Sequence, residues 1–288
     1  MAPLFQRMTV IGCGLIGGSL ARAAKGRGLV GEVVGAGRSL GTLERALALG
    51  VVDRFDADRG RACEGADMVV AATPVRSVPP VVAEVLPHLA PGAILTDVGS
   101  VKAPLVRAVE SLPLGGVRFV GGHPIAGTER AGVEASFAEL FEDHFTILTP
   151  TERTDREALA RVASLWEGVG AKVVELPPER HDDLLADISH LPHLVAYALV
   201  AAVGEGEGLR FAAGGFRDFT RIASSDPAMW RDICLENRDA LLAALDRFGG
   251  TLQKFRAMVE ARRAEALEEA FGRAKGLRDE WLRSRGGR

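Results

Sequence analysis

Short apolar runs alternate with helical patterns over the first part of the chain. Residues 8–12 predict a strand that ends in glycines, and residues 15–26 continue as an alanine-rich helix. The same alternation predicts further strands at 33–35, 67–72, 93–97, 119–120, 146–148 and 172–176, with helices at 40–49, 78–89 and 155–168. Alternating strands and helices are typical of a parallel sheet with helices on both faces.

The pattern changes at Pro177 and Pro178, after which almost every segment has helical spacing. Asp226 and Pro227 form a helix-start signal, with the acid at the N-cap and proline in the first turn. Residues 237–283 predict long, charged helices. We therefore expect an α/β Rossmann-type domain with a parallel sheet over residues 1–178, and an all-α domain over residues 179–288.

A glycine pattern lies between the first strand and the first helix. Gly12, Gly14 and Gly17 match G-x-G-x-x-G, with Leu15 and Ile16 between the last two glycines. The first glycine permits a tight turn, the second lets a pyrophosphate approach the backbone, and the third lets the helix pack on the strand. A glycine-rich turn between ordinary elements is the competing interpretation, but the strand–helix context favours dinucleotide binding.

Dinucleotide sites with this glycine pattern usually carry an acidic residue about 20 residues further on, which binds the ribose. This chain has Gly37, Arg38 and Ser39 there instead. An arginine suits a 2′-phosphate, so the sequence leans toward NADP over NAD. Thr73, Pro74 and Val75 end another strand, where the carboxyl edge of the sheet should face the cofactor.

Composition excludes several other classes of protein. The formal net charge is −3 and aromatic residues make up 6% of the chain, so we expect no nucleic-acid surface. Cys13, Cys63 and Cys234 are far apart and fit no metal spacing, which indicates reduced thiols in a cytoplasmic protein and no metal ion. We see no apolar run that approaches the length of a membrane span, so we expect no membrane partner.

Residues 121–130 hold the strongest candidate for chemistry. His123 lies between two glycines and Pro124, in a stretch too rich in turn residues for a core helix or strand. A neutral imidazole near pH 7 is a natural proton acceptor, and a dehydrogenase needs one when a hydroxyl carbon gives up its hydride. A structural loop histidine is the alternative.

Five stretches together resemble the prephenate/arogenate dehydrogenase family of tyrosine biosynthesis. The resemblance runs in order over roughly residues 8–250. The stretches are residues 12–18, 96–102 (Thr-Asp-Val-Gly-Ser-Val-Lys), 122–127 (Gly-His-Pro-Ile-Ala-Gly), 189–193 (Ser-His-Leu-Pro-His) and 214–223. The resemblance implies oxidative decarboxylation of prephenate to 4-hydroxyphenylpyruvate, with hydride transfer to NAD(P)+. It also implies a helical domain that dimerises, so we expect a homodimer through the C-terminal helices.

The resemblance also implies roles for individual residues. His123 corresponds to the catalytic base, and Ser100 to a serine that hydrogen-bonds this histidine and the substrate hydroxyl. Arg221 corresponds to the arginine that binds the ring carboxylate, and an arginine fork suits a carboxylate. Arg217 lies four residues earlier, and we expect it to be solvated. Ser100 could equally cap a helix, and Arg221 could pair with Asp218.

Further residues are expected to line the substrate cleft. The resemblance implies this place for Ser189, His190, His193 and Trp230, and a place near the mouth for Glu129 and Asp218. His193 should lie nearest the substrate, whereas an interior, structural role is equally open for His190. Pro192 should kink the helix or start it afresh.

Three alternatives remain open. The first is arogenate in place of prephenate as the substrate, in an NADP-linked reaction that gives tyrosine directly. A dehydrogenase of the β-hydroxyacid type would share the fold, but it usually has a lysine on the first long helix of the second domain, where this chain has serine and histidines. A nucleotide-sensing dimer without catalysis would need no His123, Ser100 or Arg221.

Overall fold

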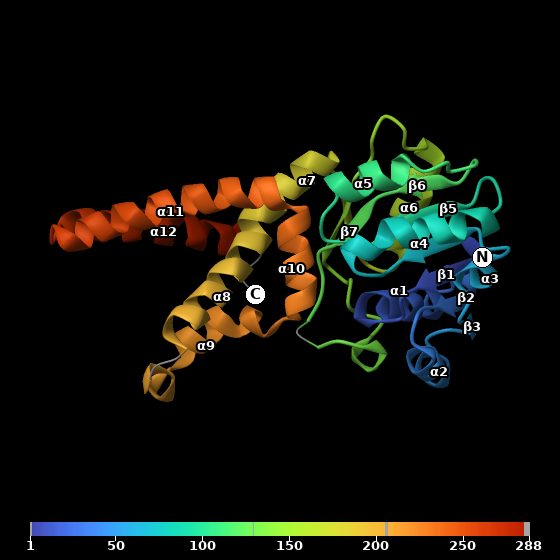
Figure 1. Cartoon of the computed structure of the whole chain (residues 1–288), viewed down its shortest axis with the longest axis horizontal. Coiled ribbons are helices and arrows are strands. Elements are labelled where there is room, and N and C mark those ends of the chain that lie inside the picture. The colour runs from blue at the N-terminus through green and yellow to red at the C-terminus, as the bar shows by residue number, and fades with distance from the viewer. Residues whose placement is uncertain (1, 129, 205–206, 285–288) are drawn as a thin grey trace. The chain divides into compact units, whose positions relative to one another are not determined.

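The computed structural model describes residues 2–128, 130–204 and 207–284, which form two compact units. The first unit runs to Arg238, and the second begins at Asp239. A six-stranded sheet in the order β3-β2-β1-β4-β5-β6 forms the centre of the first unit, and all its neighbouring strands are parallel (Figure 1). These strands are β1 (Phe5–Ile11), β2 (Val30–Ala36), β3 (Arg54–Asp56), β4 (Met68–Ala71), β5 (Ile94–Asp97) and β6 (Arg118–Val120).

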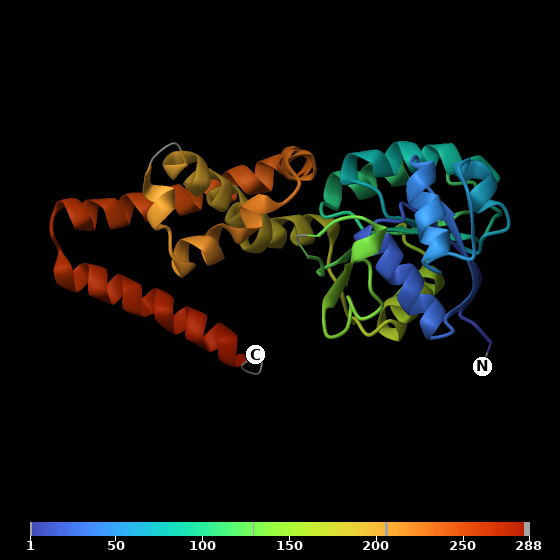
Figure 2. The same ribbon diagram turned by 90° about the horizontal axis from the view of Figure 1, so that it is seen from below.

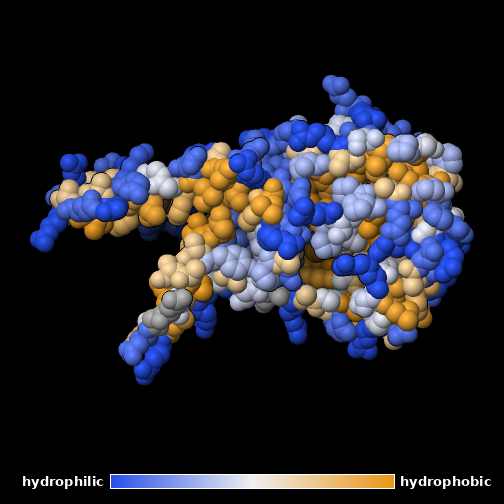
Figure 3. Space-filling model, in the orientation of Figure 1, coloured by the Kyte–Doolittle hydropathy of each residue, from blue (hydrophilic) through white to orange (hydrophobic). Residues whose placement is uncertain are grey.

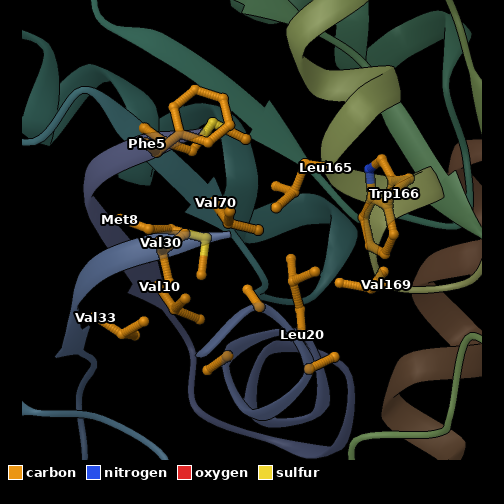
Figure 4. Close-up of a cluster of buried hydrophobic side chains, with 14 of the residues drawn as sticks. Phe5, Met8, Val10, Leu20, Val30, Val33, Val70, Leu165, Trp166 and Val169 are labelled. Carbon is orange, nitrogen blue, oxygen red and sulfur yellow. The ribbon is translucent and has the colours of Figure 1, made fainter. Parts of the chain in front are cut away.

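Helices cover both faces of this sheet because successive strand residues point to opposite sides. Val70 of β4 packs in one core cluster with Leu20 and Trp166, whereas its neighbour Val69 packs in the other. Figure 4 shows the first cluster between the strands, α1 and α6. The helices are α1 (Leu15–Gly26), α2 (Leu40–Ala48), α3 (Arg59–Cys63), α4 (Val78–Val85), α5 (Ala103–Glu110) and α6 (Arg156–Gly168).

A second sheet carries the histidine segment. It consists of β7 (Gly122–Pro124), β8 (Phe145–Leu148) and β9 (Lys172–Glu175), with β7 antiparallel and β9 parallel to β8. The expectation that the runs at 146–148 and 172–176 continue the parallel sheet is therefore wrong. Only Gly121 separates β6 from β7, which is far too short for a crossover to a parallel neighbour. His123 consequently lies in a short strand, opposite Ile147, rather than in a loop.

Every described element after Glu175 is helical, so the predicted fold class is confirmed. The helices are α7 (Pro178–Leu185), a π-helical turn (Ala186–His190), α8 (Leu191–Val203), α9 (Gly214–Thr220) and α10 (Pro227–Glu236). The Asp226 side chain accepts a hydrogen bond from the Met229 N–H, as an N-cap does. The compact unit continues to Arg238, so the domain boundary at residue 178 stays a prediction.

Pro192 interrupts the helical run from α7 to α8. Proline has no N–H for the helical ladder, and the π-helical turn lies directly before it. By length and composition alone, Pro178–Val203 is apolar enough to span a membrane, which corrects the expectation from the sequence. Helices of soluble proteins pass the same test, and His181, Asp182 and His190 on this run are buried inside the first unit.

The second unit is a helical hairpin of α11 (Arg238–Glu260) and α12 (Ala264–Ser284) (Figure 2). Arg262 makes the turn with a left-handed φ of 49°, and Phe255 stacks on Phe271 with 5.6 Å between ring centroids. Several large apolar side chains stay exposed on the hairpin. They are Leu252, Val259, Phe271, Leu277 and Trp281.

Candidate active site

The glycine loop has the geometry of a dinucleotide cradle. Gly12 has a left-handed φ of 103°, and a Cβ there would lie 2.3 Å from the Ala72 carbonyl oxygen. A Cβ on Gly17 would lie 2.2 Å from the Gly12 carbonyl oxygen, so both positions require glycine for folding. A Cβ on Gly14, at the N-terminus of α1, would meet no atom within 4 Å. The space above Gly14 is where backbone N–H groups and the helix dipole favour a phosphate.

The Thr73 hydroxyl adds a polar atom beside this cradle. Its Oγ1 is buried and has no hydrogen-bond partner among the described residues, while its methyl carbon is 3.4 Å from the Cβ position of Gly12. Pro74 is exposed, and buried Val75 begins the 3₁₀ turn that leads into α4. A buried hydroxyl without a partner is costly unless something binds it, so the chain's own residues fit a nucleotide at this edge of the sheet.

The residues expected at the ribose lie after β2. Arg38 and Ser39 are both exposed. The Ser39 hydroxyl accepts a hydrogen bond from the Thr42 N–H at 3.3 Å and caps α2. The cap explains Ser39 without a ligand, whereas Arg38 has an exposed guanidinium beside the carboxyl end of the strand.

A buried ion pair fixes the backbone just before His123. Lys102 is fully buried, and its ammonium pairs with the Asp97 carboxylate and donates to the Gly122 carbonyl at 2.8 Å. The Gly122 N–H donates to Asp97 in turn, at 3.2 Å. Burial lowers the pKa of Lys102, and the Asp97 carboxylate acts in the opposite direction. Removing one partner of such a pair typically costs about 3–5 kcal/mol.

His123 belongs to a chain of three side chains. Its Nδ1 lies 2.8 Å from Nε2 of His181, and Nδ1 of His181 lies 2.8 Å from a carboxylate oxygen of Asp182. Burial lowers the pKa of His123 well below its usual value of 6.5, and the positive charge of Lys102 and any charge that His181 would carry act in the same direction. The imidazole is therefore neutral near pH 7, which is the form that accepts a proton.

Ser100 is expected from the sequence to hydrogen-bond His123, and this role stays a prediction. The structure describes no hydrogen bond between its hydroxyl and His123, whose Nδ1 faces His181 instead. Ser100 lies half-buried in the turn between β5 and α5, two residues before Lys102. A contact between Ser100 and a substrate stays a prediction.

The rings of His190, His193 and Trp230 form an aromatic cluster. The ring of His193 stacks on Trp230 with 3.6 Å between centroids, and His190 meets the same indole edge-on at 6.1 Å. Burial lowers the pKa of His193, the hydrogen bond to the Ser189 carbonyl raises it, and the positive charge of Arg221 lowers it. Arg221 is therefore close enough to His193 to affect its pKa.

His190 has the features of an interior histidine. It is 1% exposed, its Nδ1 accepts a hydrogen bond from the Asn237 amide at 3.0 Å, and burial lowers its pKa to about 4. Its Nε2 is buried with no partner among the described residues. The indole nitrogen of Trp230 is likewise buried with no hydrogen-bond partner among the described residues.

The residues predicted at the mouth are less constrained. Asp218 and Arg217 on α9 are exposed and pair with each other at 3.3 Å, so Arg217 is solvated as expected. Arg221 is exposed and begins the 3₁₀ turn Arg221–Ser224. Glu129 lies outside the described residues. No cluster of metal ligands occurs among the residues whose placement is described.

Sequence reasoning missed five residues of the site: Asp97, Lys102, His181, Asp182 and Asn237. Asp97 and Lys102 lie inside the stretch that carries the family resemblance, but charged residues are almost never fully buried unless paired, and the pairing is visible only in space. His181 and Asp182 follow the two prolines at the start of a polar helix. The available signal was a histidine next to an acid at a helix start, which is common on surfaces.

Comparisons with known proteins agree with this geometry. The family model for the nucleotide-binding domain of prephenate dehydrogenase matches residues 20–175, and the model for its dimerization domain matches residues 177–273. Prephenate dehydrogenase of Bacillus subtilis is 43% identical over 97% of this chain and 77% of its own length. Cyclohexadienyl dehydrogenase of Zymomonas mobilis is 39% identical over 96% of each chain.

A solved structure gives the same result. Prephenate dehydrogenase of Aquifex aeolicus, crystallised with hydroxyphenyl propionate and NAD+, superposes with a TM-score of 0.91 at 38% identity. The superposition covers 96% of this chain and 98% of that one. The two family models and these relatives together cover nearly the whole chain. The protein therefore belongs to the prephenate dehydrogenase family.

Proposed function

We propose that the protein is a prephenate dehydrogenase that converts prephenate to 4-hydroxyphenylpyruvate and carbon dioxide in tyrosine biosynthesis. The observation that carries the proposal is the buried, neutral imidazole of His123 in the same compact unit as the glycine cradle. A hydride acceptor and a proton acceptor are the two groups that oxidation of a secondary alcohol requires. The relatives named above support the choice of substrate.

In the proposed mechanism, a nicotinamide cofactor held at the glycine cradle would supply the acceptor for the hydride on C4 of the substrate. The hydroxyl on the same carbon passes its proton to His123 as it becomes a carbonyl. The C1–carboxylate bond then breaks, carbon dioxide leaves, and the electron pair of that bond makes the ring aromatic with a phenolate oxygen. The proton held on His123 returns to this oxygen, so the reaction releases no net proton.

We assign substrate contacts to Arg221 and to the aromatic cluster of His190, His193 and Trp230. Arg221 binds the ring carboxylate through its guanidinium, and the stacked pair of His193 and Trp230 forms one wall of the site. Ser189, His190 and Ser100 contact the substrate at its edges, with Ser100 on the hydroxyl. Glu129 and Asp218 act at the mouth of the site.

For the cofactor, we propose NAD(P)+ with a preference for NADP+. Arg38 is exposed at the position where an acid would bind the ribose of NAD, and a guanidinium suits a 2′-phosphate. The Aquifex relative was crystallised with NAD+, so NAD use is the alternative. Arg38→Ala should lower kcat/KM with NADP+ about 10–100-fold, as expected for a lost charge-assisted hydrogen bond, and change kcat/KM with NAD+ less than threefold.

We also propose that the protein is a cytoplasmic homodimer. The match to the dimerization domain supports this, and so does the surface of α8, where apolar side chains gather (Figure 3). Half-buried or exposed apolar side chains on α8 are Leu191, Leu194, Val195, Leu199, Val200 and Val203. Light scattering after size exclusion should give about twice the mass of one 30.5 kDa chain.

Arogenate is the second candidate substrate, because the Zymomonas relative carries the broader name cyclohexadienyl dehydrogenase. Arogenate and prephenate share the ring and differ in a side-chain amino or keto group. Initial rates with prephenate or arogenate, each paired with NAD+ or NADP+, test the proposal through the absorbance of the reduced nicotinamide. We expect the highest kcat/KM with prephenate. No rate with any of the four pairs would reject the enzymatic function.

A further inference from the structure

The hydrogen bonds around Asp182 determine the proton positions on its neighbours. Its two carboxylate oxygens accept the backbone N–H groups of Lys102 at 2.7 Å and Ala103 at 2.8 Å, so the carboxylate is a pure acceptor. The oxygen that binds Lys102 also lies 2.8 Å from Nδ1 of His181. Nδ1 of His181 must therefore carry a proton and donate it to Asp182.

The same reasoning extends to His123. A neutral His181 with a proton on Nδ1 has a lone pair on Nε2, and this lone pair faces Nδ1 of His123 at 2.8 Å. Nδ1 of His123 must then be the donor in that bond. A neutral imidazole has only one N–H, so Nε2 of His123 keeps its lone pair.

We propose that His181 and Asp182 are positioning residues that hold neutral His123 with its proton on Nδ1, so that Nε2 is the nitrogen that accepts the substrate proton. The inference deepens the proposed function and rests on it for the identity of the substrate. When Nε2 takes the proton, Nδ1 continues to donate to His181, and the Asp182 charge stabilises the imidazolium across the intervening ring. No bond in the chain has to rearrange.

Other polar and charged groups near His123, His181 and Asp182 have partners of their own and do not take over these hydrogen bonds. Lys102 and Asp97 bind each other and the Gly122 backbone, while His190 is bound by Asn237. Burial lowers the pKa of His181 as well, and its hydrogen bond to Asp182 acts in the opposite direction. Both imidazoles in the chain are therefore neutral near pH 7, as the assignment of protons requires.

The direct test is nitrogen NMR of protein with ¹⁵N-labelled histidine. The chain has six histidines, so loss of one set of signals in His123→Gln identifies the catalytic ring. We expect His123 at pH 7.5 to show a protonated Nδ1 and a bare Nε2. A protonated Nε2 in the parent protein would overturn the proposal, and His123→Gln is needed only to assign the signals.

Two substitutions of His181 separate positioning from mere packing. In His181→Gln the side-chain carbonyl can still accept from Nδ1 of His123, whereas His181→Asn is too short to reach it. We expect His181→Asn to lose the tautomer preference and about 10²–10⁴-fold in kcat, the range for a mispositioned base. His181→Gln should keep the tautomer and most of the turnover. Equal losses in both variants with an unchanged tautomer would contradict the role.

Asp182→Asn removes the negative charge, and Asp183→Asn on the exposed face of α7 is its matched control. We expect a kcat at least tenfold lower only for Asp182→Asn, with cofactor affinity unchanged in both variants. Equal kcat values in the two variants would argue against Asp182. The NMR result does not depend on turnover, so absence of any rate in the parent would reject the proposed function and leave the tautomer to be decided separately.

Discussion

His193 stacks on Trp230 with 3.6 Å between ring centroids and only 20° between ring planes, while its Nδ1 donates to the Ser189 carbonyl at 2.9 Å. These two contacts determine both the plane and the rotation of the imidazole. The donated hydrogen bond leaves Nε2 as the nitrogen that can accept from a ligand. A ring held in this way is preorganised for the substrate contact that we propose for it.

Trp230 should consequently contribute to both stability and substrate binding. Trp230→Phe keeps an aromatic face for His193, so we expect KM to rise less than about threefold. Trp230→Ala removes the stack and leaves a cavity, which should lower the free energy of unfolding by about 3–5 kcal/mol. Urea unfolding measures the stability of both variants. Equal stability in Trp230→Phe and Trp230→Ala would contradict the packing role.

The role of His123 as proton acceptor predicts a specific loss. His123→Asn should lower kcat by about 10²–10⁴-fold, as expected when a general base is removed, and leave cofactor affinity nearly unchanged. Steady-state kinetics and a titration with reduced nicotinamide measure the two quantities. His144→Asn changes an exposed histidine that directly precedes β8 and that we assign no role in the site, so it serves as the matched substitution. Parental turnover in His123→Asn would exclude the role.

Arg221 and Arg217 form a natural pair for testing carboxylate binding. Arg221→Ala should mainly raise KM, because it removes a charge-assisted contact that is worth about 1.5–3 kcal/mol and is made before the chemical step. Arg217→Ala should change KM little, since Arg217 is exposed and pairs with Asp218. The assignment is wrong if KM rises in Arg217→Ala and stays unchanged in Arg221→Ala.

The fold was largely predictable, because strand–helix alternation and the glycine loop are local patterns. The second sheet was not, since nothing in the apolar runs shows that Gly121 alone separates β6 from β7. The same limit applies to the site. His123 is marked by its glycines and proline, and Arg221 by the resemblance.

His181, Asp182 and Lys102 depend on contacts between distant segments. The Lys102 N–H reaches Asp182 across 80 positions of sequence, and His123 reaches His181 across 58. No spacing rule covers such pairs. Lysine side chains are usually exposed, and they are fully buried almost only when a partner such as a carboxylate lies beside them. Lys102 is buried because it pairs with Asp97, and the sequence alone does not show this pair.

The glycine loop provides a test that separates folding from cofactor binding. Gly14→Ala meets open space, so we expect a folded protein with weaker cofactor binding, because the methyl group occupies the approach of the pyrophosphate. Gly12→Ala would force a Cβ against the Ala72 carbonyl at a left-handed φ and should destabilise the fold itself. Thermal melting and a nucleotide titration distinguish the two. Parental nucleotide affinity in Gly14→Ala would argue against the cradle.

The buried histidines predict how stability depends on pH. Burial lowers the pKa of His190 to about 4, whereas the unfolded chain should titrate near 6.5. Between these values the unfolded state binds more protons than the folded state, so the free energy of unfolding must fall as the pH falls from 6.5 toward 4. The contribution of His190 is at most about 3.5 kcal/mol, since its pKa falls by about 2.5 units and one unit corresponds to about 1.4 kcal/mol. Urea unfolding at pH 7 and pH 5 measures it, and His190→Gln should reduce the difference between the two pH values while exposed His144→Gln should not. An equal pH dependence in both variants would show that His190 is already protonated in the folded protein.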